Sequence, residues 1–181
     1  PTERLPRMNI FVIDYGQDDP TKCTAKKMVR MDLATAVSRK FHASSQMIVL
    51  NPYAETILSP EDREVKAILV VDCSWKLARD VFFKKLGGKH RRLPALLAGN
   101  PTNYARLWTL SSVEAVGAAL YILGQVDEAR RCLAIYKWCE TFQTLNEEPL
   151  EAYRNAQSSG DVLRLEREYF PQLEKPEGQE F

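Results

Sequence analysis

The stretch RLPALLAGNPTNYARLWTLSSVEAVGAALYILG, residues 92–124, decides how this chain folds. It opens with a short apolar run, residues 93–98, which we interpret as a buried strand. Gly99-Asn100-Pro101 ends that strand, because proline has no backbone N–H to give to a sheet. A loop rich in asparagine, tyrosine, arginine and tryptophan follows. Its amides and π-faces suit an adenine-like ligand, although an ordinary strand-to-helix crossover has the same pattern.

A buried helix completes this stretch. Ser111 and Glu114 form a capping box, in which each side chain satisfies a backbone N–H at the helix start. Apolar residues fill nearly every position of residues 113–123, so we expect the helix to be buried on most sides. Gly124 supplies its end.

Before this stretch, apolar segments alternate with helical ones. We expect strands at residues 8–13, 47–50 and 67–71. We expect helices at residues 32–39, from 59, and at 75–86, the last ended by Gly87-Gly88. Thr24 is expected to cap a further short helix that contains Lys26, Lys27 and Arg30. The strands are apolar throughout rather than alternating, which is typical of a parallel sheet covered on both faces.

After residue 112 only helical patterns occur. They cover residues 113–123, 126–145, 149–156 and 162–169, with breaks at Asn146 and Ser159-Gly160. The fold class predicted is therefore α/β, with a parallel-sheet N-terminal half followed by an all-helical C-terminal half. The boundary predicted lies near residue 92, dividing the chain into residues 1–92 and 93–181.

The composition argues against a membrane protein and against a metal site. The chain is 45% hydrophobic and 27% charged, and it has no apolar run long enough to span a bilayer, so we expect a soluble cytoplasmic protein without a membrane partner. Its four cysteines have no CxxC spacing, and two histidines are too few for a metal centre, so no metal is expected. With a net charge of +1, any affinity for nucleic acid needs a local basic patch.

Polar residues follow the predicted strands. Asp14, Asn51, Asp72 and Asn100 each come directly after one. The carboxyl ends of parallel strands share one edge of a sheet, where open α/β folds bind ligands. The pattern predicts a ligand cleft at this edge, although any one of these residues can instead cap a turn.

Among the segments that follow predicted strands, Asp72-Cys73-Ser74-Trp75 offers the most side chains that could bind a ligand. An aspartate at the end of a buried strand can face a cationic or hydroxyl-bearing ligand. The π-face of Trp75 can attract a sulfonium or ammonium group. Alternatively, Asp72 and Ser74 cap the next helix and Trp75 packs in the core.

Basic residues form two clusters. The first contains Lys22, Lys26, Lys27 and Arg30, and the second, around Gly87-Gly88, contains Lys84, Lys85, Lys89, His90, Arg91 and Arg92. Lysine and arginine beside a glycine pair suit a phosphate backbone, so we expect RNA contacts from Lys22, Lys26, Lys27, Lys89, Arg91 and Arg92. A solvated charged face is the alternative.

Several motifs together resemble one family. They are the segments 18–24, 49–52, 71–75, 87–94, 97–104 and 110–115. Over residues 8–170 the chain resembles the small-subunit ribosomal RNA aminocarboxypropyltransferases of archaea and eukaryotes. This resemblance implies a SPOUT-like knotted crossover formed by residues 92–124. It also implies S-adenosylmethionine as the donor, a modified pseudouridine in small-subunit rRNA or the pre-ribosomal small subunit as the acceptor, and methylthioadenosine as the product.

The resemblance also implies a cofactor site. By position, Thr24, Leu50, Pro52, Asp72, Trp75, Leu97, Leu110 and Ser112 would line it, and Trp75 with Ala78 would enclose the methyl group. Asp72 would be catalytic, either assisting deprotonation of the base or balancing the sulfonium charge. We expect a monomer, because the helical second half can cover the surface by which knotted methyltransferases dimerise. An RNA methyltransferase and a non-catalytic ribosome-assembly protein that binds RNA are the alternatives.

Overall fold

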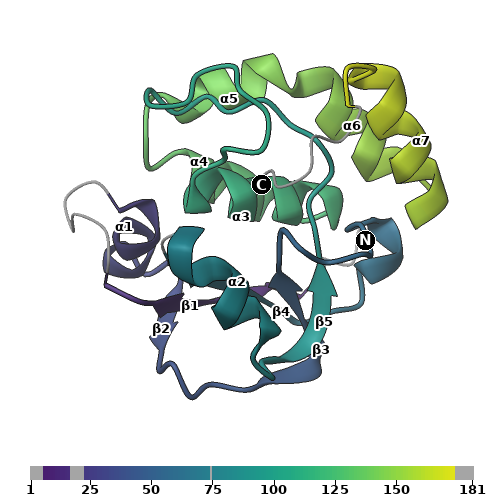
Figure 1. Cartoon of the computed structure of the whole chain (residues 1–181). Coiled ribbons are helices and arrows are strands. Elements are labelled where there is room, and N and C mark those ends of the chain that lie inside the picture. Colours follow the sequence, from purple (N-terminus) through teal and green to yellow (C-terminus); the bar gives the residue numbers. More distant parts are fainter. Residues whose placement is uncertain (1–5, 17–22, 74, 174–181) are drawn as a thin grey trace.

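A twisted sheet packs under a layer of helices in this protein (Figure 1). The computed structural model describes residues 6–16, 23–73 and 75–173. No helix in these ranges is long and apolar enough to cross a membrane. The helices of the C-terminal half lie together on one side of the sheet.

The sheet has five strands, all paired in parallel, in the order β2-β1-β4-β3-β5. They are β1 (Asn9–Asp14), β2 (Thr35–Val37), β3 (Ala43–Leu50), β4 (Ala67–Asp72) and β5 (Gly87–Arg91). The parallel sheet predicted from the sequence is confirmed. In its register Asp14 lies directly beside Asp72, at the carboxyl ends of β1 and β4.

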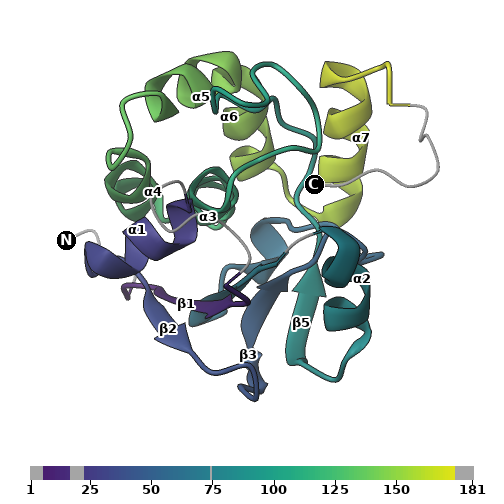
Figure 2. The ribbon, with the colours of Figure 1, turned by 60° about the vertical axis from the view of Figure 1, so that its left-hand side comes forward.

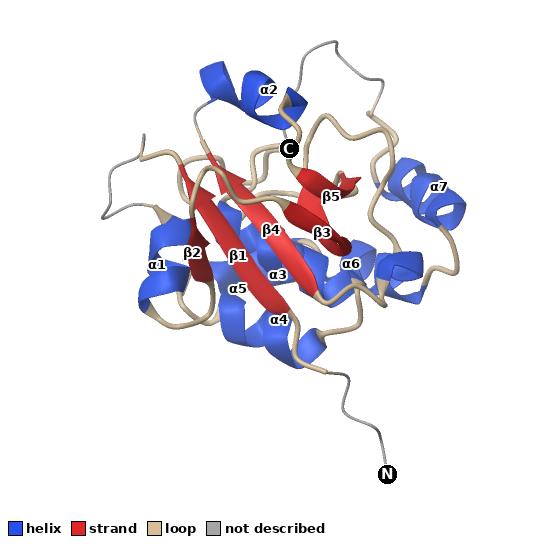
Figure 3. Ribbon diagram, turned by 90° about the horizontal axis from the view of Figure 1, so that it is seen from below, coloured by secondary structure: helices blue, strands red, loops and turns tan. Residues whose placement is uncertain are grey.

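The two faces of the sheet contact different helices. Ile68 and Val70 belong to the core shared with α1 (Thr24–Arg30) and α3 (Ser112–Ile122). Leu69 and Val71, which point the other way, pack in a second cluster with α2 (Trp75–Phe83). Figure 3 shows α2 apart from the other helices. Even- and odd-numbered residues of β4 are thus apolar and pack against helices on both faces of the sheet, as the unbroken apolar run predicts.

The C-terminal half is helical, as predicted. After α3 come α4 (Val126–Leu133), α5 (Cys139–Leu145), α6 (Glu147–Asn155) and α7 (Ser159–Tyr169). Gly124 ends α3 with a positive φ of 84°. One continuous helix over residues 126–145 was a wrong prediction, because α4 ends at Leu133 and α5 begins at Cys139. Ser159-Gly160 is not a break either, since Ser158 caps α7 and both residues lie in its first turn.

The predicted capping box forms, and the structure holds a second one. Ser111 and Glu114 cap α3, and Ser59 and Asp62 cap the short 3-10 helix η1 (Pro60–Asp62). The helix predicted from residue 59 is therefore only one turn long.

The predicted strand at residues 93–98 is wrong. The segment is mostly buried but joins no sheet, and side chains satisfy its backbone. The Leu97 N–H donates to Asn146 Oδ1 at 2.7 Å, and the Asn146 amide donates to the Leu97 carbonyl at 2.8 Å. The Ala95 N–H donates to Glu166 Oε2 at 2.8 Å. Asn100 was predicted to lie at the ligand-binding edge because it would follow this strand. Since residues 93–98 are not in the sheet, that reason no longer holds.

The fifth strand is instead β5, where the sequence indicated only a helix end at Gly87-Gly88 followed by basic residues. Gly87 and Gly88 have φ of 72° and 74°, and a Cβ on Gly87 would lie 2.3 Å from the Ala43 carbonyl oxygen. Both glycines therefore let β5 approach β3 closely, and a role beside phosphates stays a prediction. The helix predicted at residues 32–39 is also wrong: Asp32 adopts φ 58°, and β-branched Thr35 and Val37 form edge strand β2.

The division of the chain at residue 92 stays a prediction. Arg92 itself donates two hydrogen bonds to the Glu166 carboxylate of α7, at 2.9 and 3.1 Å. The two halves are thus joined at the residue where the sequence suggested a boundary.

Candidate active site

The sheet has a topological switch point between β1 and β4. The chain leaves β1 through α1 on one face, and leaves the adjacent β4 through α2 on the other face. Figure 2 shows these two helices diverging to opposite sides of the sheet. Open α/β sheets bind ligands in the crevice at such a point, beyond the carboxyl ends of the strands. Here that place has an aspartate on each strand, Asp14 and Asp72.

Asp72 is held by a thiol. Cys23, directly before α1, donates its S–H to Asp72 Oδ2 at 2.8 Å. Burial, together with this hydrogen bond, raises the pKa of the Cys23 thiol from its ordinary 9.0 to about 12. The thiol thus stays protonated and remains a donor at neutral pH. No pattern in the sequence indicates this contact, because 49 residues separate the two side chains.

Thr24 brings the second half of the chain to the same place. Its hydroxyl oxygen accepts a hydrogen bond from the Val113 N–H at 3.1 Å, and so caps α3 rather than its own helix. The α3 N-terminus, with Ser112, therefore lies against the start of α1, which contacts Asp72 through Cys23. Three of the predicted cofactor residues, Thr24, Asp72 and Ser112, are brought together in this way.

Glu114 fixes the loop that leads to this helix end. Its carboxylate is fully buried and accepts from the N–H groups of Gly99 and Asn100, both at 2.8 Å. It also accepts from the Asn100 amide at 3.0 Å and from the Ser111 N–H at 2.8 Å. One carboxylate thus joins both ends of the loop, a function beyond its role in the capping box.

The other predicted cofactor residues lie in different surroundings. Leu50 is buried in the core with α1 and α3, whereas Ala78, only 2% exposed, belongs to α2 and packs against the opposite face of the sheet. Pro52, Leu97 and Leu110 are half-buried. The side chain of Trp75 lies outside the described residues, so a methyl pocket formed with Ala78 stays a prediction, while Ala78 has a clear packing role.

Most of the basic residues expected to contact RNA are engaged inside the molecule. Lys26 lies 3.5 Å from Asp14, and Lys27 donates to the Ile135 carbonyl at 2.8 Å. Lys27 also lies 4.0 Å from the centre of the Tyr136 ring. The remaining pairs are Arg91 with Asp62 at 3.2 Å and Arg92 with Glu166 at 2.9 Å. These four side chains thus have partners within the described residues, and their contacts with RNA stay a prediction.

Lys89 differs from them. It is exposed on the edge strand β5 and forms no ion pair or hydrogen bond with the described residues. Lys84 and Lys85 are exposed just before β5, at the amino ends of the strands and thus at the edge opposite Asp72. Lys22 lies outside the described residues.

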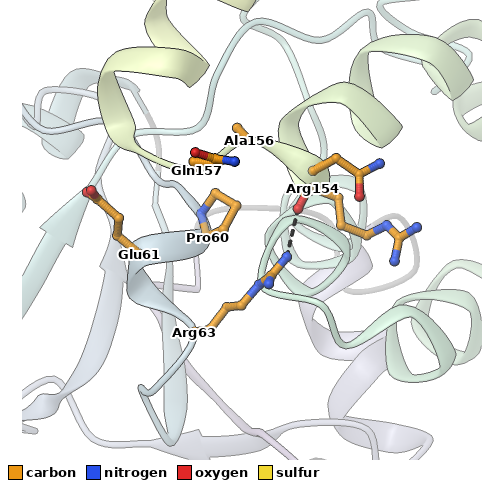
Figure 4. Close-up of a pocket in the computed structure, with 7 residues that line it drawn as sticks. Pro60, Glu61, Arg63, Arg154, Ala156 and Gln157 are labelled. Atoms are coloured by element: carbon orange, nitrogen blue, oxygen red, sulfur yellow. Dashed lines mark hydrogen bonds between the residues drawn. The ribbon is translucent and has the colours of Figure 1, made fainter.

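A groove of about 380 Å³ lies elsewhere, between η1 and the junction of α6 with α7 (Figure 4). Arg63 reaches across it and donates to the Arg154 carbonyl at 2.7 Å. Because that carbonyl is in the last turn of α6, the contact caps the helix and links the two halves. None of the predicted cofactor residues within the described chain lines this groove.

Comparison with known proteins decides the family. The 16S rRNA aminocarboxypropyltransferase of Sulfurisphaera tokodaii is 43% identical over 169 residues, which cover 92% of this chain and 98% of that protein. The enzyme of the same name from Methanosarcina mazei is 42% identical, covering 88% of this chain and 94% of its own. The chain belongs to the 16S rRNA aminocarboxypropyltransferase family.

Two further comparisons agree with this family. The family model described as "Ribosome biogenesis protein, C-terminal" matches residues 48–170. The solved structure of the SAM-dependent rRNA:acp-transferase Tsr3 from Vulcanisaeta distributa superposes with a TM-score of 0.78 at 40% identity, covering 91% of this chain and 89% of that one. The α/β fold of this aminocarboxypropyltransferase family member is therefore shared with a solved relative.

A second model, "Possible Fer4-like domain in RNase L inhibitor, RLI", matches residues 8–40. Iron–sulfur clusters are held by four cysteine thiolates, or by a mixture of cysteine and histidine. Residues 8–40 contain one cysteine, Cys23, and no histidine. Its thiol is engaged with Asp72, so this segment does not fit an iron–sulfur cluster.

Proposed function

We propose that this chain transfers the 3-amino-3-carboxypropyl group of S-adenosylmethionine to small-subunit rRNA. The observation that carries the proposal is the 43% identity over 92% of the chain to a 16S rRNA aminocarboxypropyltransferase. That match spans nearly all of the described chain, on which Asp14, Asp72, Cys23 and the α3 N-terminus lie.

The residues at the switch point fit this cofactor. S-adenosylmethionine has a cationic sulfonium and two ribose hydroxyls, and carboxylates such as Asp14 and Asp72 can face either group. Leu97 and Leu110, at the two ends of the loop fixed by Glu114, offer apolar contacts to an adenine. When bound, the cofactor supplies a carbon already activated by the adjacent sulfonium.

The protein's contribution is then positioning and electrostatics. In the reaction a ring nitrogen of a modified pseudouridine attacks the carbon next to sulfur, the C–S bond breaks, and methylthioadenosine leaves with the bonding pair. Placing the two reactants in line gives most of the acceleration in such transfers. Asp72, oriented by Cys23, either accepts the proton of the base or balances the sulfonium charge, and both roles need an ionised carboxylate.

We also propose a knotted crossover in residues 92–124, a monomeric enzyme and the pre-ribosomal small subunit as the substrate particle. The contacts of Glu114, Asn146 and Glu166 with residues 95–111 support a closely held crossover at this point. Lys89, exposed and unpaired within the described residues, is the phosphate contact that we retain from the second basic cluster.

Label transfer tests the proposed reaction. The protein is incubated with small-subunit rRNA and with S-adenosylmethionine labelled separately in its carboxyl and methyl carbons. We expect carboxyl label in the RNA, no methyl label, and methylthioadenosine as the product. Methyl label with S-adenosylhomocysteine would instead identify an RNA methyltransferase. Absence of heat in calorimetry with S-adenosylmethionine would favour a non-catalytic RNA-binding protein.

A further inference from the structure

The loop of residues 101–110 is exposed at its centre but rigidly held at its ends. Glu114 accepts hydrogen bonds from Gly99 and Asn100 on one side and from Ser111 on the other. Inside the loop, the Ala105 N–H donates to the Ala98 carbonyl at 2.7 Å, and the Ala98 N–H donates to the Arg106 carbonyl at 2.8 Å. This loop therefore presents its side chains from a fixed backbone.

The loop also holds two strained residues. Ala105 and Trp108 have φ of 59° and 62°, in the left-handed region that L-residues other than glycine rarely adopt. Such strain persists only where surrounding contacts impose it, and it is found most often at binding and catalytic sites. For Ala105, the hydrogen bond of its N–H to the Ala98 carbonyl is such a contact.

Tyr104 lies at the exposed centre of this loop. At 59% exposure it is the most exposed of the large hydrophobic side chains in the described chain. Its hydroxyl makes no hydrogen bond, and its ring stacks on no other ring, among the described residues. Arg106, two positions later, is also exposed, and its guanidinium is without an ion pair in the same part of the chain. The aromatic ring of Tyr104 and the guanidinium of Arg106 are thus both exposed on a loop whose backbone is held in place, and neither has a partner among the described residues.

The loop begins and ends beside the expected cofactor site. Leu97 and Leu110 flank it, and Leu97 forms an isolated antiparallel bridge with Leu107 inside it. A group that binds the outer side of this loop would consequently lie next to the cofactor. In the proposed reaction that neighbour is the RNA that receives the aminocarboxypropyl chain.

We propose that Tyr104 is a stacking platform for an unpaired base of the substrate RNA, with Arg106 binding an adjacent phosphate. An exposed aromatic ring beside a cation is the combination by which proteins hold single-stranded RNA. A protein partner would instead need a wider apolar surface, and the neighbours of Tyr104, Asn103 and Ala105, do not provide one. This inference rests on the proposed function, since it takes rRNA as the substrate.

Binding of a fluorescent single-stranded rRNA oligonucleotide tests the platform. Tyr104→Ala should raise the Kd for RNA about tenfold, whereas Tyr104→Phe, which keeps the stacking ring, should bind within about twofold of wild type. The slope of log Kd against log salt should be unchanged in both, because no charge is removed. The Kd for S-adenosylmethionine and the melting temperature should also stay at wild-type values.

Tyr169→Ala is the matched control. Tyr169 is a 38% exposed tyrosine in α7, beside Glu147, Glu148 and Glu151, where like charge would repel RNA. It should leave the RNA Kd unchanged. If Tyr104→Ala binds RNA as wild type does, or if Tyr104→Phe is as weak as Tyr104→Ala, base stacking on this residue is refuted.

The two proposals can fail separately. If wild-type protein binds the oligonucleotide but transfers no carboxyl label, the proposed reaction fails and the Tyr104 comparison still decides the stacking. If label is transferred and Tyr104→Ala changes neither RNA affinity nor the transfer rate at subsaturating RNA, only the stacking inference is overturned.

Discussion

The Asn146 side chain pairs with the Leu97 backbone as a neighbouring strand would. Oδ1 accepts from the Leu97 N–H at 2.7 Å, and Nδ2 donates to the Leu97 carbonyl at 2.8 Å. Nδ2 also donates to the Phe142 carbonyl at 2.8 Å, and Asn146 itself is fully buried. A single amide thus satisfies the backbone of an extended segment that has no place in the sheet, and it does so at the junction of α5 with α6.

Asn146→Ala should therefore destabilise the protein strongly. It leaves the Leu97 N–H and carbonyl without partners, each costing about 1–3 kcal/mol, so we expect a loss of roughly 2–6 kcal/mol in the free energy of unfolding. Denaturant titration measures this. Asn155→Ala, which removes an exposed amide bonded to Glu151, should change stability by less than about 1 kcal/mol. Equal losses in the two variants would contradict the pairing role.

Gly87 and Gly16 make a second pair of matched substitutions. Both have positive φ, 72° and 68°, but a Cβ on Gly87 would meet Ala43 and His42 atoms, whereas a Cβ on Gly16 meets nothing within 4 Å. Gly16→Ala should cost only the backbone strain, about 1–2 kcal/mol. Gly87→Ala should cost roughly 3 kcal/mol or more, because β5 must move away from β3. A smaller loss for Gly87→Ala than for Gly16→Ala would show that β5 is not held this closely.

Thiol reactivity should distinguish the four cysteines. Burial raises the pKa of Cys23 and Cys139 to about 12 and that of Cys132 to about 11. At pH 8 these three should react slowly with iodoacetamide, because the thiolate is the nucleophile. Half-buried Cys73 should react first, and Cys73→Ser should remove the fast phase. Unfolded protein should label at all four positions.

The same shifts predict a pH dependence of stability. The folded state holds these thiols protonated above their ordinary pKa of 9.0, so their contribution to stability is complete below pH 9. It should be lost as the pH rises through about 11 to 12, where the folded thiols ionise. Melting temperatures measured between pH 8 and 11 should fall less in Cys132→Ala than in wild type.

How much the sequence predicts depends on whether a signal is local. The apolar run of β4 and the capping box of Ser111 with Glu114 are local, and both were predicted correctly. Residues 93–98 have the composition of a strand, yet Asn146 and Glu166, about 50 and 70 residues away, replace the sheet as their partner. Strand β5 reads Gly-Gly-Lys-His-Arg and has no apolar pattern, so only its fit against β3 makes it a strand.

In the candidate site, too, local features were predicted from the sequence and contacts between distant segments were not. Asp14 and Asp72 were identified because each follows an apolar strand, and the register places them side by side. The Cys23–Asp72 hydrogen bond and the capping of α3 by Thr24 join distant segments, so no spacing in the sequence indicates them. The charge of Arg92 is visible in the sequence, whereas its pairing with Glu166, 74 residues away, is not.

Lys89 and Arg92 should therefore respond differently to substitution. Lys89→Ala removes an exposed, unpaired charge, so RNA affinity should fall and the salt slope should drop by about one, with stability unchanged. Arg92→Ala leaves the Glu166 carboxylate, 9% exposed, without its cation, which costs about 3–5 kcal/mol when such a pair is broken. RNA titrations and thermal melts of both variants check this. If Arg92→Ala is as stable as wild type but binds RNA more weakly, Arg92 contacts RNA and its pair with Glu166 does not stabilise the fold.

The Cys23 thiol should act through Asp72. Cys23→Ala removes the donor at 2.8 Å from Asp72 Oδ2, and a hydrogen bond to a charged group contributes about 1.5–3 kcal/mol. We expect the affinity for S-adenosylmethionine or the rate of carboxyl-label transfer to fall by roughly tenfold or more. Cys23→Ser keeps a donor at this position and should recover most of the loss, which a role in packing alone does not predict. Cys132→Ala, a buried thiol on α4, is the control for loss of volume. If Cys23→Ser is as impaired as Cys23→Ala while both melt as Cys132→Ala does, the hydrogen bond does not position Asp72.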